Sequence, residues 1–309
     1  MASFGIVGLG RIGGGLARNA LGKGHSVAGF DPGVSSIEGL NRVFSLSDLC
    51  SGLPSPRTIF LYVPAGGAVD ETIQGLLPHL QKGDIVVDGG NSYWRDSRAR
   101  AAELSGMGIH FVDLGTSGGL TGALNGACFM AGGDRSAFDQ IEPILQDLAV
   151  AGGVVYCGPS GAGHYVKLVH NGIEFGMLQA IGEGIDLLEK FDTDLPILEV
   201  VGAWRNGSVV RSWLVDLMHE ALTRKPSLEE VPGYIEDTGE VNWLVEDAMK
   251  LEVPIPVISQ SVMQLFASRD DRRTWARAVA MMRHGFGAHP YGPEEAVRAG
   301  RHSSRRGEK

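Results

Sequence analysis

Four side chains suited to acid–base chemistry lie within residues 161–175. They are Lys167, His170, Asn171 and Glu174. In a helix that turns ~100° per residue, they project within an arc of roughly 100°. An amine, an imidazole, an amide and a carboxylate on one face can act as proton acceptor, proton donor and anion clamp. The apolar neighbours are expected to point elsewhere and pack: Val166, Leu168, Val169, Ile173 and Phe175.

A solvated Lys–Glu salt bridge is the alternative interpretation of this helix face. The apolar neighbours, together with the imidazole and amide beside the pair, favour a catalytic group instead. The elements that would position this face follow from the rest of the sequence.

A dinucleotide-binding pattern opens the chain. Residues 4–7 predict a strand, residues 14–21 a helix and residues 25–31 a second strand. Between the first strand and the helix stands Gly8-Leu9-Gly10-Arg11-Ile12-Gly13. In such a Gly-x-Gly-x-x-Gly turn the glycines permit a tight turn, admit a pyrophosphate and let helix and strand approach. The helix N-terminus favours the anion. A plain glycine turn is the alternative, and the flanking strands favour the cofactor site.

Asp31 at the end of the second strand indicates which dinucleotide binds. A carboxylate there accepts hydrogen bonds from the adenine ribose of NAD and repels the 2′-phosphate of NADP. The following residues, Pro32-Gly33-Val34-Ser35, bring no cation, and Arg11 is the nearest one. We therefore expect NAD as the preferred cofactor, with NADP as the second choice.

Further predicted strands end in polar glycine loops. Strands are expected at 58–63, 85–88 and 110–113, and loops at 64–66, 89–92 and 115–119. Ligands bind beyond the carboxyl ends of parallel strands. The pattern predicts an α/β fold whose N-terminal part is a Rossmann-type, doubly wound parallel sheet.

Helical periodicity dominates the second half of the chain. A long central helix is expected to carry Lys167 and to continue to about residue 191. Further helices are expected at 196–204, 209–222, 242–251 and 257–266. We expect a dinucleotide-binding domain at 1–158, an all-helical substrate and dimerisation domain at 159–300, and a disordered tail at 301–309.

The composition excludes several classes of protein. A hydrophobic content of 43% and a charged content of 20% are typical of a globular chain, and a net charge of −9 argues against nucleic-acid or anionic-membrane binding. Apolar runs are shorter than the ~20 residues of a membrane helix, and no signal peptide is expected. The cysteines Cys50, Cys128 and Cys157 lack metal-ligand spacing, which favours a reducing, cytoplasmic setting and no metal.

These motifs together resemble the 6-phosphogluconate dehydrogenase family in its shorter, bacterial-type form, within the wider β-hydroxyacid dehydrogenases. The resemblance covers nearly the whole chain. It rests on the N-terminal fingerprint, residues 88–92 (Asp-Gly-Gly-Asn-Ser), 116–119 (Thr-Ser-Gly-Gly), 161–174 and 283–289. The run Lys-Leu-Val-His-Asn-Gly-Ile-Glu is specific, because simpler members usually carry Lys-x-x-Asn without this His and Glu.

The resemblance implies a metal-independent, NAD(P)-dependent oxidative decarboxylation of 6-phosphogluconate to ribulose 5-phosphate and CO2. Lys167 would be the base that takes the C3 hydroxyl proton, and Glu174 the acid that protonates C1 of the enediol. Burial would favour the neutral lysine. An apolar helix face would favour the protonated glutamic acid.

The resemblance also implies the remaining site residues. The substrate, a small anionic sugar acid, would contact Asn91, Ser117, Gly118, Gly119, His170 and Asn171. Arg283 and His289 would reach the phosphate end in a neighbouring subunit of a homodimer or homotetramer; a surface Arg and His is the alternative. The cofactor would contact Gly8, Gly10, Arg11, Ile12, Gly13, Asp31, Val63, Pro64 and Asn91.

The chain departs from the family pattern at the phosphate end. Phe175 stands where relatives have a tyrosine, and Met263-Gln264-Leu265 stands where they have Phe-Ala-Arg. Arg269 lies one helical turn further on as a candidate substitute. A charged hydrogen bond contributes ~1.5–3 kcal/mol, so a lost arginine corresponds to roughly tenfold to a hundredfold in affinity.

Two other functions therefore stay open. The first is a dehydrogenase of the same superfamily acting on another β-hydroxy acid or a sugar or cyclitol phosphate, with or without decarboxylation. The second is a cofactor-binding sensor that has lost catalysis, against which the retained Lys167 and Glu174 argue.

Overall fold

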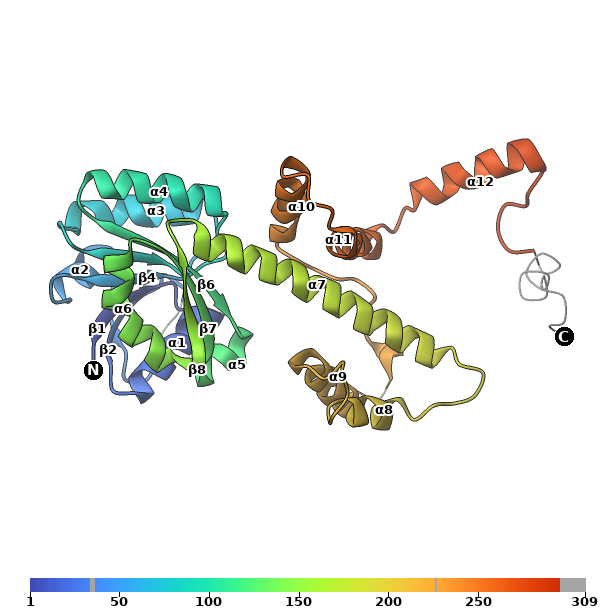
Figure 1. Cartoon of the computed structure of the whole chain (residues 1–309), viewed down its shortest axis with the longest axis horizontal. Helices are drawn as coiled ribbons and strands as arrows, with labels where there is room; N and C mark the ends of the chain where they lie inside the picture. Colours follow the sequence, from blue (N-terminus) through green and yellow to red (C-terminus); the bar gives the residue numbers. More distant parts are fainter. Residues whose placement is uncertain (34–36, 226, 295–309) are drawn as a thin grey trace. The chain divides into compact units, whose positions relative to one another are not determined.

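A mainly parallel sheet fills the N-terminal half of the protein, and a long helix leads away from it (Figure 1). The computed structural model describes residues 1–33, 37–225 and 227–294. Within these ranges the eight-stranded sheet has the order β3-β2-β1-β4-β5-β6-β7-β8. The expected tail at 301–309 lies outside the described residues. The strands are β1 (Ser3–Val7), β2 (Ser26–Phe30), β3 (Asn41–Arg42), β4 (Thr58–Leu61), β5 (Ile85–Asp88), β6 (His110–Ser117), β7 (Ala127–Gly133) and β8 (Ala149–Gly158).

The predicted doubly wound sheet is confirmed, with one difference in strand direction. Strands β1 to β6 pair in parallel, whereas β6 and β7 pair antiparallel. The predicted turn at residues 115–119 begins later than expected, because Thr116 and Ser117 still pair with Phe129 and Cys128 of β7. Strands β3, β7 and β8 were not predicted from the sequence.

Two separate hydrophobic cores cover the two faces of the sheet. Successive strand residues alternate between them, as Ile6 and Val7 do, because side chains along a strand point to opposite faces. This burial on both sides explains the continuous apolar runs of the strands. One face packs against α1 (Arg11–Gly22), α5 (Gly119–Asn125) and α6 (Arg135–Leu148). The other packs against α2 (Leu46–Ser51), α3 (Gly67–Leu76) and α4 (Trp94–Gly106).

The long helix α7 (Ala162–Glu189) starts directly on the sheet. Its Gly163 has no side chain, and a Cβ there would lie 2.4 Å from the carbonyl oxygen of Asp113 and 2.5 Å from that of Met130. Gly115 of β6 is equally close, since its Cβ would lie 2.5 Å from Cβ of Lys167. Glycine at both positions therefore lets the first turns of α7 contact the strands directly. The predicted long central helix is confirmed.

The remaining helices follow α7, and the chain divides into two compact units. One unit holds Met1–Leu195 with Thr238–Gln260, and the other holds Pro196–Asp237 with the residues from Ser261 onward. Helix α12 was not predicted. The helices are α8 (Ile197–Trp204), α9 (Trp213–Arg224), α10 (Glu240–Lys250), α11 (Pro256–Arg269) and α12 (Thr274–Gly287), and the short 3-10 turns are η1 (Leu77–His79) and η2 (Leu228–Glu230).

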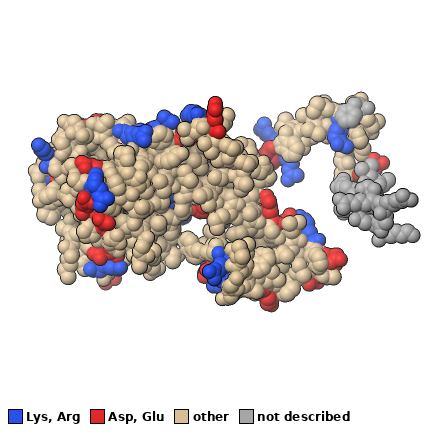
Figure 2. Space-filling view, in the orientation of Figure 1, with Lys and Arg blue, Asp and Glu red and all other residues tan. Residues whose placement is uncertain are grey.

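Charged side chains are spread over the surface. On the face shown in Figure 2, acidic and basic groups lie near one another rather than in blocks of one sign. Among the helices of the described residues, none combines the length and the apolar character needed to span a membrane.

Candidate active site

The loops that follow β1, β4, β5 and β6 lie together at the carboxyl end of the sheet. These strands are neighbours and run in the same direction, so their carboxyl ends lie side by side. The loops carry most of the residues that the sequence singles out. The sheet therefore gathers them as expected for a nucleotide-binding fold.

The glycine turn after β1 has the geometry that a dinucleotide requires. A Cβ on Gly8 would lie 2.3 Å from the carbonyl oxygen of Tyr62, and a Cβ on Gly13 would lie 2.0 Å from that of Gly8. Gly10, by contrast, has no atom within 4 Å of its Cβ position. Two glycines thus allow the backbone to close, and the third leaves open space where a pyrophosphate would lie. The residues present fit a dinucleotide.

Asp31 follows β2 and is tied to the glycine turn. Its carboxylate accepts hydrogen bonds from the backbone N–H of Leu9 and of Gly33, each at 2.7 Å. Arg11 begins α1 and is exposed, with the half-buried Ile12 after it. Val63 and Pro64 follow β4 at the same end of the sheet. The predicted cofactor residues therefore lie either on the loops after these strands or, for Arg11, Ile12 and Gly13, in the first turn of α1.

Lys167 is buried, with 8% of its surface exposed. Burial lowers the pKa of its amine, and the negative charges of Glu174 and Glu240, with a smaller contribution from Cys128, act in the opposite direction. A buried lysine of this kind is easier to deprotonate than a surface lysine. The amine therefore has the environment that a general base needs.

His170 connects the α7 face to the end of β6. Its Nε2 lies 3.1 Å from Oγ of Ser117, and its Nδ1 lies 3.3 Å from Oδ1 of Asn171. Burial and the charge of Lys167 lower the pKa of the imidazole. The four side chains of the face are therefore grouped as the helix spacing predicts.

Glu174 lies one turn further along α7, with its Oε2 3.8 Å from Nδ1 of His170. Its side chain is 40% exposed, so the apolar surroundings expected for it are absent from the described chain. The expected packing of Val166 and Ile173 is also absent, since both are exposed. The later turns of α7 have fewer neighbours, which accounts for Glu174 and Ile173. Val166 lies near the start of the helix, beside the buried Lys167, and is exposed there.

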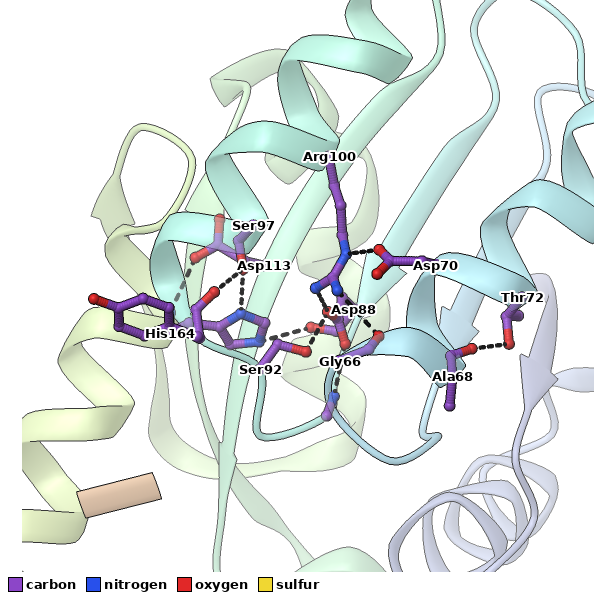
Figure 3. A network of polar contacts seen from close by, with 12 residues as sticks. Gly66, Ala68, Asp70, Thr72, Asp88, Ser92, Ser97, Arg100, Asp113 and His164 are labelled. Carbon is purple, nitrogen blue, oxygen red and sulfur yellow. Dashed lines mark hydrogen bonds and ion pairs between the residues drawn. The ribbon is translucent and has the colours of Figure 1, made fainter. Parts of the chain in front are cut away.

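A buried polar network fixes the start of α7 (Figure 3). The carboxylate of Asp113 on β6 accepts hydrogen bonds from the backbone N–H of Gly161 at 2.7 Å and of His164 at 2.9 Å. These donors have no partner within the helix, so the carboxylate caps it from another element. The helix that carries Lys167 is thereby joined to the centre of the sheet.

His164 joins the same network to the loop after β5 (Figure 3). Its Nε2 donates to the carbonyl oxygen of Asp88 at 3.1 Å, and its Nδ1 lies 2.7 Å from Oγ of Ser97 on α4. The carboxylate of Asp88 accepts from the hydroxyl of Ser92 at 2.7 Å. Arg100 lies beside it, 3.6 Å from Asp88 and bonded to Asp70 at 2.7 Å.

The sequence patterns assigned no role to these supporting residues, although Asp88, Ser92 and His164 lie within the motifs that carry the family resemblance. Asp88 and Asp113 are fully buried acids within apolar strands, which is the signal that could have found them. His164 lies in the stretch that carries Lys167, but its neighbours come from distant segments. Residues 89–92 thus form a loop that is anchored by the buried hydrogen bonds of Asp88 and Ser92.

Asn91 and the turn after β6 complete the group. The side-chain amide of Asn91 donates to Oε1 of Glu240 at 2.8 Å, and Glu240 was not predicted as a site residue. Gly118 and Gly119 have φ values of 113° and 57° and form the turn between Ser117 and α5. A Cβ at Gly119 would meet no atom within 4 Å, so space is open above this turn.

The residues of the expected phosphate end lie apart from this group in the sequence. Leu265 lies on α11 with 9% of its surface exposed, and Arg283 and His289 lie on and just after α12, in the second unit. Arg269 is engaged within that unit. Its guanidinium donates to Asp237 at 2.6 Å and lies 3.6 Å from Glu236, so two carboxylates already hold the candidate substitute.

Both halves of the chain match family models. Residues 3–158 match the NAD-binding domain of 6-phosphogluconate dehydrogenase, and residues 163–299 match the C-terminal domain of that enzyme.

Related proteins share this similarity over most of the chain. The NAD(+)-dependent, decarboxylating 6-phosphogluconate dehydrogenase of Haloferax volcanii is 40% identical over 293 residues, which cover 93% of this chain and 97% of that protein. The NADP(+)-dependent enzyme of Bacillus subtilis is 38% identical over 287 residues, 86% of this chain and 61% of that longer protein.

A solved structure agrees with the sequence comparisons. The Plasmodium falciparum 6-phosphogluconate dehydrogenase, determined in its apo form and with NADP+ or 6-phosphogluconate, matches with a TM-score of 0.79 and 26% identity, over 96% of this chain and 68% of that one. The glycine turn, the buried lysine and these matches agree: the chain belongs to the 6-phosphogluconate dehydrogenase family.

Proposed function

We propose that the protein catalyses the NAD(P)-dependent oxidative decarboxylation of 6-phosphogluconate to ribulose 5-phosphate and CO2. The observation that carries the proposal is the buried amine of Lys167, whose pKa is lowered by burial, next to His170 and Ser117 at the carboxyl edge of the sheet. Family membership supports the same reaction.

Lys167 acts first as a base and then as an acid. The neutral amine removes the proton of the C3 hydroxyl while the C3 hydrogen departs as a hydride. Bound NAD(P) supplies the hydride acceptor. The resulting β-keto acid loses CO2, and the ammonium of Lys167 returns its proton to the carbonyl oxygen to give the enediol.

Glu174 completes the reaction by protonating C1 of the enediol while the C2 hydroxyl gives its proton back to the neutral amine of Lys167, which leaves the C2 carbonyl of the product. Its 40% exposed side chain supports this role in one respect, since the carboxyl group can recover a proton from water. His170, Asn171, Asn91, Ser117 and the Gly118–Gly119 turn hold the hydroxyls and the carboxylate of the substrate in this proposal.

The cofactor lies along residues 1–158 in this proposal, and residues 159–300 supply the substrate and dimer contacts. The pyrophosphate faces the open space at Gly10, and the adenine ribose binds Asp31. The carboxylate of Asp31 supports NAD over NADP, because a 2′-phosphate would meet a negative charge. Free cysteines at Cys50, Cys128 and Cys157 support a cytoplasmic location.

Steady-state kinetics test the proposed reaction directly. NADH or NADPH formation is measured with 6-phosphogluconate and with gluconate, and CO2 release is measured in parallel. We expect turnover of 6-phosphogluconate with one CO2 released for each reduced cofactor. Negligible turnover would reject the proposal, and reduced cofactor without CO2 would favour the non-decarboxylating alternative.

The role of Lys167 has a matched control at the residue that follows the same helix. Lys167→Met is expected to abolish turnover and leave cofactor affinity unchanged. Lys190→Met removes an exposed lysine that pairs with Asp186, and it is expected to retain full activity. Substantial activity of the Lys167 variant would contradict its assignment as base.

The proposed homodimer or homotetramer, completed by Arg283 and His289, is testable by complementation. Lys167→Met and Arg283→Ala are each expected to be nearly inactive. In a mixed dimer, one site combines an intact Lys167 with an intact partner Arg283. Random reassociation of equal amounts should therefore restore about a quarter of the wild-type activity. Absence of recovery would place Arg283 outside the neighbouring site.

A further inference from the structure

Glu240 brings a second carboxylate to the proposed active site. It is the first residue of α10, it is half-buried, and no motif in the sequence singled it out. One carboxylate oxygen accepts from the amide of Asn91 at 2.8 Å, and the other accepts from the hydroxyl of Thr238. Its charge also acts on Lys167. Glu240 therefore contacts one proposed substrate residue, and its charge acts on the proposed base.

The contact determines which way the Asn91 amide points. A carboxylate only accepts hydrogen bonds, so the NH2 group of Asn91 must face Glu240. The carbonyl oxygen of the amide consequently points away from Glu240. Asn91 is thereby set to accept a hydrogen bond, which suits a hydroxyl group of a sugar acid rather than its carboxylate.

A second acid on α10 holds the helix against the same segment. Asp247 is 1% exposed, and its carboxylate accepts from Oη of Tyr93 at 3.0 Å, from Nε1 of Trp94 at 2.6 Å and from Arg95 at 3.4 Å. Asp247 follows Glu240 by seven positions, about two helical turns, so both lie on one face of the helix. Glu240 holds the segment 91–95 at Asn91, and Asp247 holds it at residues 93–95.

Helix α10 also packs against α7 at Gly172, five positions beyond Lys167. A Cβ at Gly172 of α7 would lie 2.4 Å from a methyl group of Leu244, which shows how closely the two helices approach. The position of Glu240 is therefore set by a buried carboxylate on one side and by helix packing on the other.

We propose that Glu240 is a positioning residue of this site, which orients the amide of Asn91 toward a substrate hydroxyl and stabilises the ammonium that Lys167 forms when it takes the substrate proton. This inference rests on the proposed role of Lys167 as base. The charged or titratable groups that act on Lys167 are Glu240, Glu174, His170 and Cys128, and of these only Glu240 also binds Asn91 among the described contacts.

The pH dependence of kcat/KM tests the electrostatic part. Activity rises with pH as the lysine base becomes neutral. Glu240→Gln removes the negative charge but keeps a carbonyl acceptor for Asn91. Its rising limb should therefore lie at lower pH than in the wild type, and its plateau kcat should fall because the ammonium is less stabilised. Glu246→Gln changes the same charge on an exposed position of α10 and should leave both unchanged.

The proposal would be overturned if the rising limb of the kcat/KM pH profile of Glu240→Gln lay at the same pH as in the wild type. The outcome is separate from a failure of the proposed function, because that failure appears as activity in Lys167→Met or as inactivity of the wild type. If Glu240→Gln does not fold, Glu240→Asp provides the second measurement. It keeps the charge, so its limb should stay near the wild-type position while its KM rises through the shorter reach to Asn91.

An exchange of donor and acceptor tests the orienting part. Asn91→Asp places two carboxylates against each other and should raise KM by at least about tenfold. The double variant Asn91→Asp with Glu240→Gln restores a hydrogen bond of reversed direction. Because a carboxylate oxygen at position 91 again faces the substrate in that variant, KM should recover by several-fold. No recovery would show that the contact does not orient residue 91.

Discussion

Asp113 offers a sharp test of how the fold holds the helix that carries Lys167. Its fully buried carboxylate accepts from two backbone N–H groups at the start of α7, Gly161 at 2.7 Å and His164 at 2.9 Å. Asp113→Asn keeps the size of the side chain but removes the charge. It also replaces one acceptor oxygen by an NH2 group, which cannot accept from the backbone N–H that faces it.

The expected loss follows from these two contacts. One hydrogen bond to a charged group, worth ~1.5–3 kcal/mol, is lost, and the other weakens to the ~0.5–1.5 kcal/mol of a neutral bond. We expect the free energy of unfolding to fall by about 2.5–4.5 kcal/mol, a large part of the ~5–15 kcal/mol typical of proteins. Turnover should fall as well, because Lys167 lies one turn beyond the capped residues.

Urea unfolding followed by circular dichroism measures the change, and Asp139→Asn is the matched control. Asp139 pairs with Arg135 at 2.7 Å on the exposed surface of α6, so its loss should cost only ~0–1 kcal/mol. If both variants unfold at the same urea concentration, the buried carboxylate does not stabilise α7 and the reasoning fails.

Three further predictions concern stability and cofactor binding. Burial lowers the pKa of Lys167, so the folded protein binds fewer protons than the unfolded chain between that lowered pKa and the ordinary lysine value of 10.5. The buried charge therefore destabilises the fold at lower pH, and this cost is lost as the pH rises toward 10.5. Lys167→Met should unfold at a higher urea concentration than the wild type near neutral pH, by a difference that shrinks as the pH rises; a difference that grows with pH would contradict the burial argument. Asp31→Ala should reduce the ratio of kcat/KM for NAD over NADP by about tenfold to a hundredfold; an unchanged ratio in initial-rate assays would exclude Asp31 as the discriminating group. Gly10→Ala should fold normally, because its Cβ meets only open space, and should bind NAD(P) weakly in calorimetry, because that space is where the pyrophosphate would lie. Gly13→Ala should lower the unfolding midpoint, because its Cβ would lie 2.0 Å from the carbonyl oxygen of Gly8. Equal stability of the two variants would refute this distinction.

The elements that the sequence predicts well are those with a strong local pattern. Strands β1, β2, β4 and β5 are apolar runs buried on both faces, and α7 has uninterrupted helical periodicity. The helix spacing alone also groups Lys167, His170 and Asn171. These features depend on residues near one another in the chain, so a pattern of a few residues is sufficient.

The features that the sequence did not predict depend on distant partners. Strand β7 is Ala-Cys-Phe-Met-Ala-Gly-Gly, whose small residues and glycines are more typical of a loop. It is a strand because it pairs with β6 and β8. Glu240 reaches Asn91 across 149 residues, and Asp113 reaches Gly161 across 48. The exposure of Glu174 depends on where α7 leaves the sheet. No local pattern carries information of this kind.

The contact of Gly163 and Gly115 with the neighbouring backbone has a mechanical consequence. Side chains in a core can change rotamer and let a helix slide, but a helix seated on peptide groups has no such adjustable layer. The backbone at Lys167 is then held in place, and the amine can move only as far as the side chain allows. Any motion that accompanies the proposed reaction must therefore bring the substrate and the surrounding loops to this point, while the helix that carries Lys167 stays in place.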